Sequence, residues 1–445
     1  MRGSNLDNPR SAAAAEGIWT IVAESTSLNR FLAIVALFAL TISPIVGTLA
    51  AALFVGVSLA CIALQPADIA TAMVRFWPIF LLSIVAILST MWSDAPERTL
   101  RAGIQLLITF VAAIAICRRL DSSTMILALF ASFLAIDLLA TLSVPRSLSL
   151  GMPLIGPFGS KNAMGITAEI HLALSVALLC DPPQRWPWRI AAIASIPLAV
   201  GLIVLAQSAG AVTSSVLFIV LFLVLATLAK VPSRARILLV MLAFVLLALS
   251  VAFSADIVGA VNSFRQDVLH KDASLTGRTY LWNYADGLIA QRPLLGHGYY
   301  AFWRQGNVEA EGLWRWGGIA SRSGFNFHNA MIEMQVDLGM VGLVVFLASC
   351  AAVLGYALYR HIVKPSVPLA FLLAMTIVFY IRSYAESGLF APFSLPTILW
   401  VATLVYAAGD KAARAMHPGA RGRPRTARMP RYAAGSARRG VGGAR

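Results

Sequence analysis

Long apolar runs, separated by short polar connections, extend over most of the chain. A helix that crosses the hydrocarbon region of a membrane needs about 20 mostly apolar residues, because each adds about 1.5 Å along the axis. Such runs predict twelve spans, at 31–43, 46–64, 77–92, 100–117, 123–143, 162–180, 189–206, 211–230, 236–254, 340–359, 367–385 and 389–408. Ser43-Pro44 also fits a kink within one long first helix. The pattern predicts an all-α polytopic membrane protein.

The polar segments divide the chain into five parts. We expect a cytoplasmic N-terminal segment at 1–30, nine spans within 31–254, an outward loop at 255–339, three spans within 340–409 and a basic cytoplasmic tail at 410–445. The first part is polar, and the apolar run after it has no small-residue cleavage site. We therefore expect no cleavable signal peptide.

Composition and charge support this interpretation and indicate which connections face the cytoplasm. Of 445 residues, 59% are hydrophobic and 12% are charged, whereas a soluble domain has about a quarter charged residues. The formal net charge is +15, and the tail from Asp410 holds ten Lys or Arg against one acidic residue, which gives +9 of it. Cations also recur in alternate connections, as at Arg118-Arg119 and at Arg360 with Lys364. This is typical of the positive-inside rule, so the basic balance indicates topology and not nucleic-acid binding.

The segment 255–339 is long but too ordered in pattern to be a linker. Thr276 to Thr279 predicts the start of a helix that Pro293 ends. The apolar positions of that helix share one face, at Leu281, Ala285, Leu288 and Ile289. Asn329 predicts the N-cap, and Gly339 the C-terminal stop, of a second short helix at the membrane surface.

Arg278 and His328 are the leading candidates for chemistry in this loop. A cation in the first turn of a helix opposes the macrodipole, so Arg278 does not serve helix stability. Free N–H groups at a helix start bind anions, and an arginine adds bidentate phosphate contacts. The structural alternative is a surface ion pair with Asp272 or Asp286. His328 has a side chain that can deprotonate a hydroxyl near neutral pH, although a lone histidine is more often structural.

The loop is also rich in aromatic residues, including Trp282, Tyr299 and Trp303. Rings at a membrane boundary commonly form interfacial belts at the ends of spans. These rings are spread through the loop instead, which favours a platform on which the apolar faces of sugar rings stack.

Two further outward regions contain charged residues that are candidates for substrate binding. Arg146 and Lys161 flank a Gly/Pro-rich connection, and Lys161 lies at a helix start, where an anion-binding role is plausible. Arg382 and Glu386 lie four residues apart at the outer end of a predicted span, which fits an intrahelical ion pair. Ionisable residues at membrane depth are nonetheless functional candidates.

Several kinds of site are missing from the sequence. It contains no Walker-type lysine loop for ATP-driven transport. No His or carboxylate cluster has clear metal spacing, and none of the four cysteines falls in an outward connection, so neither a cofactor nor a disulfide is expected. Cationic and aromatic outward residues suit a substrate with an anionic leaving group and a sugar.

Linked motifs carry a resemblance to a known family. They are Thr276-Gly277-Arg278-Thr279 with Trp282, then Arg292 to Tyr299, then His328-Asn329 with Leu338 to Leu343. Together they resemble the O-antigen ligase/polymerase family of bacterial inner-membrane glycosyltransferases. Trp92-Ser93-Asp94, Thr99-Leu100-Arg101 and Gly159 to Asn162 resemble its exopolysaccharide-polymerase branch, with Ser160 where that branch commonly has histidine. The resemblance covers about residues 75–408.

The resemblance implies a fold and a set of roles. The fold would be a helical bundle of the GT-C type with one large periplasmic loop. Arg278 would stabilise the diphosphate of an undecaprenyl-diphosphate-linked oligosaccharide, and His328 would orient or deprotonate the acceptor hydroxyl. Lys161 and Arg146 would add positive charge, and Arg382 or Glu386 would close the cavity. The reaction would invert the anomeric carbon without a metal.

The resemblance leaves the acceptor open. A polymerase passes the glycan to a sugar hydroxyl of another lipid-linked repeat unit, and the branch motifs favour this function. A ligase passes it to lipid A-core. A transporter or flippase of lipid-linked sugars is an alternative of another class, and it predicts ionisable residues in the middle of several spans. Partners would be membrane lipids and, for a polymerase, chain-length regulator and export proteins, with no nucleic acid.

Overall fold

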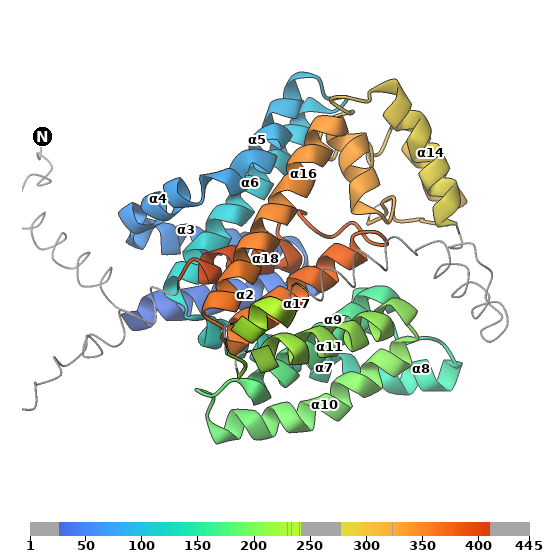
Figure 1. Ribbon diagram of the computed structural model, residues 1–445. Helices are drawn as coiled ribbons and strands as arrows, with labels where there is room; N and C mark the ends of the chain where they lie inside the picture. The colour runs from blue at the N-terminus through green and yellow to red at the C-terminus, as the bar shows by residue number, and fades with distance from the viewer. Residues whose placement is uncertain are drawn as a thin grey trace, which may run out of the picture.

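The protein is a bundle of helices with a smaller helical lobe at one end (Figure 1). The computed structural model describes residues 26–409, apart from 229, 233, 240, 242–276 and 323, and these described residues include no strand. The predicted tail at 410–445, the first 25 residues and positions 255–276 of the predicted loop lie outside the described residues, as does most of the predicted span 236–254.

The bundle contains helices from both halves of the chain. Its first part comprises α2 (Thr26–Val46), α3 (Thr48–Leu64), α4 (Pro66–Arg75), η1 (Trp77–Phe80), α5 (Leu81–Leu88), η2 (Ser89–Met91), α6 (Pro96–Arg119) and α7 (Ser122–Thr141). Then follow α8 (Val144–Leu150), η3 (Gly156–Phe158), α9 (Lys161–Cys180), α10 (Trp186–Ala206) and α11 (Ala209–Leu228). The lobe holds α14 (Arg278–Gln291) and α15 (Val308–Trp316), and the chain returns through α16 (Ala330–Val363), α17 (Val367–Arg382) and α18 (Leu395–Ala407).

The membrane character of the chain is confirmed, but the count of twelve spans is not. By length and composition, seven described helices can cross a membrane, or eight if α3 and α4, bent by 99°, form one span. Three shorter apolar stretches, at Trp77–Met91, Val367–Arg382 and Leu395–Ala407, coincide with other predicted spans. Each predicted span other than 236–254 therefore contains a helix, and several of these helices are shorter than the apolar run suggested.

The structure decides between the two interpretations of the first apolar run. Pro44 lies inside the last turn of α2, and Gly47, with φ of 75°, separates α2 from α3. The two helices are distinct and pack against each other. The break lies at Gly47 because a positive φ is readily adopted only by glycine.

The last predicted span, 389–408, starts later than expected. Residues 383–394 form an irregular segment before α18, and Phe390 and Phe393 both have positive φ. The backbone groups of this segment have partners in the bundle: the Tyr299 hydroxyl donates to Phe390 O, and Phe393 N donates to Thr109 Oγ1. Such bonds are needed because unpaired backbone groups at membrane depth cost several kcal/mol each.

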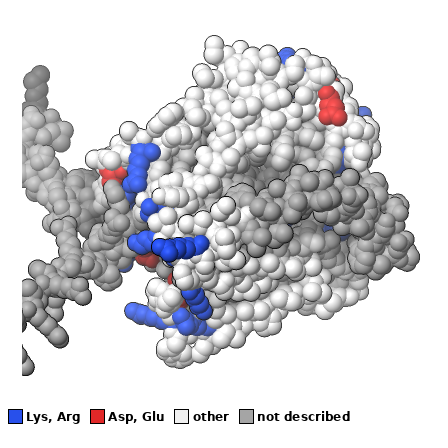
Figure 2. All heavy atoms as spheres, viewed as in Figure 1, with Lys and Arg blue, Asp and Glu red and all other residues white. Residues whose placement is uncertain are grey.

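Cations gather at one end of the molecule, the end at which α4 lies (Figures 1 and 2). Two of them bond the C-terminal end of α18: Arg75, the last residue of α4, donates to Ala408 O at 3.1 Å, and Arg360, near the end of α16, donates to Ala407 O at 2.8 Å. The C-terminal ends of α4, α16 and α18 therefore meet on the side that the charge pattern assigns to the cytoplasm. The lobe with α14 lies at the opposite side.

The lobe has a hydrophobic core of its own. The core includes the predicted apolar face of α14, at Leu281, Ala285 and Leu288, and rings from the rest of the lobe. Val336, from the first part of α16, packs in the same cluster. The predicted starts and stops are confirmed: α14 begins at Arg278 and ends at Gln291, and the Asn329 side chain accepts from Met331 N and Ile332 N. Helix α15 was not predicted.

The lobe is joined to the bundle where α16 is interrupted. Gly339 has φ of 63° and breaks α16 at the predicted stop, although the helix resumes directly into the span. The segment after α14 lies against this break: His297 N and Gly298 N donate to Val336 O and Asp337 O, and Met340 N donates to Pro293 O.

The connection between η2 and α6 attaches to the same place. Trp92 Nε1 donates to Leu295 O at 2.8 Å, and Asp94 pairs with His297 at 2.9 Å and with Arg292 at 2.8 Å. Two motifs about 200 residues apart, Trp92-Ser93-Asp94 and the stretch from Arg292 to Gly298, thus form one structural junction.

We predict that Gly339→Ala destabilises the protein by more than about 2 kcal/mol. A Cβ at this position would lie 2.3 Å from Leu294 C, and φ is positive. Thermal unfolding of the detergent-purified protein measures the effect. The matched control is Gly287→Ala on α14, where a Cβ meets nothing within 4 Å and stability should rise by up to about 1 kcal/mol. Equal melting temperatures for the two variants would contradict this role of Gly339.

Candidate functional site

The start of α14 holds Arg278 at the edge of the lobe. Gly277, with φ of 82°, precedes it, and the Trp316 ring packs so closely that a Cβ at Gly277 would lie 2.9 Å from it. No side chain caps the start of the helix. Arg278 is thus fixed in position by a glycine turn and a ring.

His328 lies in a strained turn between the lobe and α16. Its φ is 52°, a conformation that is uncommon for residues other than glycine. The turn is secured on both sides: His328 N donates to Asn326 Oδ1 at 2.8 Å, and Trp282 Nε1 donates to Phe327 O at 2.9 Å. Strained residues held in this way cluster at functional sites.

Glu386 belongs to the irregular segment 383–394. Ala330 N donates to Ser383 O at 2.8 Å, which joins the start of α16 to the end of α17. This bond brings the segment that carries Glu386 next to the turn that carries His328.

Arg278, His328 and Glu386 meet around one carboxylate. Arg278 Nη2 lies 3.4 Å from Glu386 Oε1, and His328 Nδ1 lies 3.5 Å from Glu386 Oε2. The three side chains are 21%, 26% and 28% exposed, so they are held by the protein and still accessible to a ligand. Burial alone would raise the pKa of Glu386, but its interaction with His328, together with the charges of Arg278 and Arg382, lowers it below its usual value.

Arg382 does not pair with Glu386, so the predicted intrahelical ion pair is wrong. Its guanidinium lies 2.5 Å from Glu169 Oε2 on α9 and donates to Ser214 Oγ on α11 at 2.8 Å. The helix ends at Arg382, so the four-residue spacing no longer places the two side chains on one helical face. Arg382 instead joins α17 to α9 and α11, directly before the segment that carries Glu386.

The remaining predicted cations lie apart from this cluster. Arg146 on α8 and Lys161, the first residue of α9, are exposed. Within the described ranges, no ion pair or side-chain hydrogen bond joins either of them to Glu386. Lys161 precedes Glu169 by eight residues, about 12 Å along α9. Their anion-binding role stays a prediction.

The predicted aromatic platform is largely a packed core. Tyr299 is fully buried, and burial raises the pKa of its phenol, which donates to Phe390 O at 2.8 Å. Tyr299 is therefore unavailable for stacking on a sugar, contrary to the prediction. Trp282 is half-buried and packs edge-on against Tyr384. Trp303 contacts Trp314, Phe325 and Phe327.

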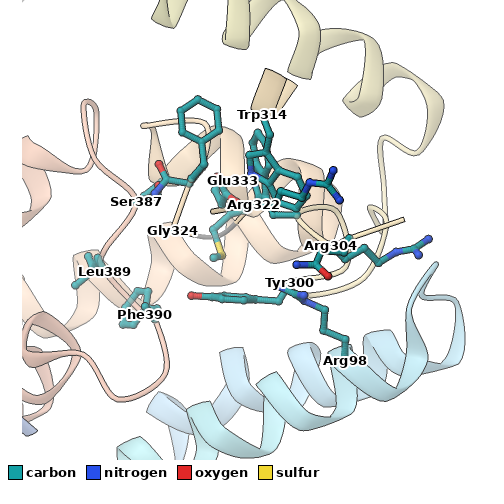
Figure 3. A pocket seen from close by; sticks show the side chains of 17 residues that line it. Arg98, Tyr300, Arg304, Trp314, Arg322, Gly324, Glu333, Ser387, Leu389 and Phe390 are labelled. Atoms are coloured by element: carbon teal, nitrogen blue, oxygen red, sulfur yellow. The ribbon is translucent and has the colours of Figure 1, made fainter. Parts of the chain in front are cut away.

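A cavity of about 590 Å³ adjoins the cluster (Figure 3). Its lining comprises residues of α6, the lobe, the first part of α16 and the segment 383–394. It includes Ser387, which follows Glu386, and Phe325, whose ring lies 5.6 Å from that of His328. Among the predicted site residues, only Trp303 lines this cavity. Its polar residues that the sequence analysis missed as site residues are Arg98, Tyr300, Arg304, Gln305, Arg322, Asn326, Glu333 and Ser387.

One of the missed residues carried a signal in the sequence. Arg98 lies in the first turn of α6, the same unfavourable position for a cation that drew attention to Arg278. Arg304, Arg322 and Glu333 had no such signal, because only the tertiary structure brings them together.

The chemistry of the site is that of anion and hydroxyl recognition. Within the described part of the chain, no three His, Cys, Asp or Glu residues lie close enough to hold a metal ion. The positive groups are arginines, which recognise phosphate and carboxylate by paired hydrogen bonds. A histidine beside a carboxylate can accept a proton from a hydroxyl.

Comparison with known proteins shows the family of the chain. A family model described as O-antigen ligase matches residues 194–347, which include Arg278 and His328. The exopolysaccharide production protein ExoQ of Rhizobium meliloti (strain 1021) is 30% identical over 329 residues, which are 72% of this chain and 74% of the relative. The chain therefore belongs to the O-antigen ligase/polymerase family of membrane proteins.

Proposed function

We propose that the protein is a glycosyltransferase, specifically a polysaccharide polymerase of the bacterial inner membrane. It would transfer a glycan from an undecaprenyl-diphosphate carrier to a sugar hydroxyl of another lipid-linked repeat unit. The observation that carries this proposal is the convergence of Arg278 and His328 on Glu386, at 3.4 and 3.5 Å, beside a cavity lined by cations and rings. The lobe would face the periplasm, and the C-terminus the cytoplasm.

The leaving group explains the need for Arg278. When the bond between the anomeric carbon and the diphosphate oxygen breaks, that oxygen gains negative charge. The guanidinium of Arg278, whose backbone is positioned by the Gly277 turn, would stabilise this charge, and arginines can supply the positive charge that a metal supplies elsewhere. Displacement from the opposite face inverts the anomeric carbon.

The acceptor needs a base, and His328 is placed to serve as one. As the acceptor oxygen forms its bond to the anomeric carbon, its proton passes to the imidazole. Glu386 then stabilises the imidazolium. Glu386 faces both Arg278 and His328. A bound diphosphate would take over Arg278 and leave the carboxylate to the histidine.

The relative and the sequence motifs favour a polymerase over a ligase. The relative's printed name is that of an exopolysaccharide production protein. A ligase that passes the glycan to lipid A-core is the second candidate, and a polymerase would have chain-length regulator and export proteins as partners. A transporter is less well supported, because the cluster around Glu386 resembles a group-transfer site.

Arg278→Ala should lower polymer output at matched expression by about 100-fold or more, because the leaving diphosphate loses its preorganised cation. The measurement is polymer formation in membrane vesicles supplied with the host's lipid-linked repeat units. Arg278→Lys should recover only part of the activity, because lysine lacks the paired donors. The control is Arg315→Ala, an exposed cation on α15. Normal output from Arg278→Ala would exclude the diphosphate role.

His328→Asn should lower turnover about 100-fold or more with little change in the melting temperature. Asparagine tolerates the positive φ of this turn but cannot accept a proton, so it separates the chemical role from the structural one. Single-turnover assays with purified lipid-linked donor measure the chemical step. Turnover at the parental rate would make His328 a structural residue.

Glu386→Gln should lower stability at neutral pH but not in acid. The pKa of Glu386 is lowered in the folded protein, so its ionised form stabilises the fold above the ordinary value of 4.5. This contribution is lost as pH falls through the lower folded pKa. Unfolding measured from pH 7 to 3 should therefore show a difference between parent and variant that shrinks with acidification. Glu97→Gln, an exposed carboxylate on α6, is the control. A difference that is constant with pH would contradict the ion-pair interpretation.

A further inference from the structure

The cavity beside the cluster is lined by positive charges that the proposed transfer step does not use. Three arginines line it: Arg98, Arg304 and Arg322. Arg322 Nε lies 3.4 Å from Glu311, so the Arg322 charge is partly neutralised within the lobe. Arg98 and Arg304 form no ion pair within the described ranges. Even with Glu333 ionised, the lining carries a net positive charge.

The nearby carboxylates are already bonded to backbone groups. Glu333 Oε2 accepts from Phe327 N at 3.0 Å, and Asp337 Oδ2 accepts from Tyr300 N at 2.9 Å. Asp337 is buried behind Tyr300 and acts on Arg98 only through its charge. Figure 3 shows Arg98 rising from α6 beside Tyr300, with Leu389 and Phe390 on the opposite side of the view from Arg304. Arg98 is exposed, and its guanidinium lies at the cavity with no hydrogen bond or ion pair to another described residue.

The other lining groups suit a sugar. The half-buried rings of Trp303 and Phe325 lie on the lobe side of the cavity, packed against the buried Trp314, and their accessible parts offer apolar contact. Gln305, Asn326 and Ser387 add amide and hydroxyl groups that bond to sugar hydroxyls. A volume of about 590 Å³ is within the usual range for small-molecule sites.

We infer that this cavity is a specificity subsite for a sugar that bears a carboxylate, within the acceptor glycan. The inference rests on the proposed glycosyl transfer and names its substrate class. The subsite adjoins His328 through Phe325, and therefore lies on the side from which the acceptor hydroxyl approaches. Arg98 and Arg304 bind the carboxylate, and the rings contact the apolar face of the sugar.

The same lining disfavours a diphosphate. Arg278, the cation assigned to the leaving group, does not line the cavity. Glu333 does, and its carboxylate would repel the additional negative charge of a diphosphate while accepting hydrogen bonds from sugar hydroxyls. A singly charged, hydroxyl-rich ligand fits this mixture of groups better than a multiply charged one.

The test is equilibrium binding to the detergent-purified full chain by ligand-observed NMR. The probes are cellobiouronic acid, which bears one carboxylate, cellobiose, which is its neutral counterpart, and inorganic pyrophosphate. We expect cellobiouronic acid to bind about tenfold or more tightly than cellobiose, and Arg98→Gln to remove that difference. Arg304→Gln should have the same effect. Arg101→Gln, the same change one turn along α6 at a residue outside the lining, should leave it intact.

Three results would overturn the inference. The first is equal or undetectable binding of the two disaccharides. The second is an uronate preference that survives both Arg98→Gln and Arg304→Gln in variants with parental melting temperatures. The third is pyrophosphate binding that depends on Arg98, which would make the cavity a diphosphate site. Because binding needs no turnover, these results are distinguishable from failure of the proposed transfer, which polymer output from Arg278→Ala tests separately.

Discussion

The arrangement of the outward half of the protein depends on one close backbone contact, between the break in α16 at Gly339 and the segment that follows α14. Two glycines with positive φ, Gly296 and Gly339, let the chains approach so closely that backbone N–H and C=O groups bond across them. Water cannot satisfy such groups near a membrane, so the bonds are difficult to replace. This contact fixes the positions of the lobe, the second part of α16 and the Trp92 to Asp94 connection relative to one another.

Charge has two separate functions in the molecule. At one end, Arg75 and Arg360 donate to carbonyl groups at the C-terminal end of α18. At the other end, a few cations surround Glu386 and the adjoining cavity. The net charge of +15 therefore says little about binding, because +9 of it belongs to the sequence from Asp410 onward.

The sequence predicted local features well and tertiary pairing poorly. The start of α14, its apolar face and the Asn329 cap depend on neighbouring residues, and each could be deduced from a short stretch of sequence. The partner of Glu386 could not, because α17 ends at Arg382 and the next turn is irregular. The burial of Tyr299 likewise follows from Phe390, 91 residues later. Arg98 could have been found by the argument used for Arg278, whereas Arg304 and Glu333 required the three-dimensional structure.

Helix α16 connects the candidate site to the bundle, with its break at Gly339 between the two parts. Its first residues follow the His328 turn, and its remainder is a long apolar helix that ends at Val363. Nine residues separate Ala330 from Gly339, so the start of α16, which directly follows the His328 turn, lies about 14 Å along the helix from the point where the span resumes. The helix therefore sets the distance between the His328 turn and the span. In the proposed transfer, the helix would keep the His328 turn at a set level relative to the membrane, so a substrate carried on a membrane lipid would need to diffuse in only two dimensions to reach it.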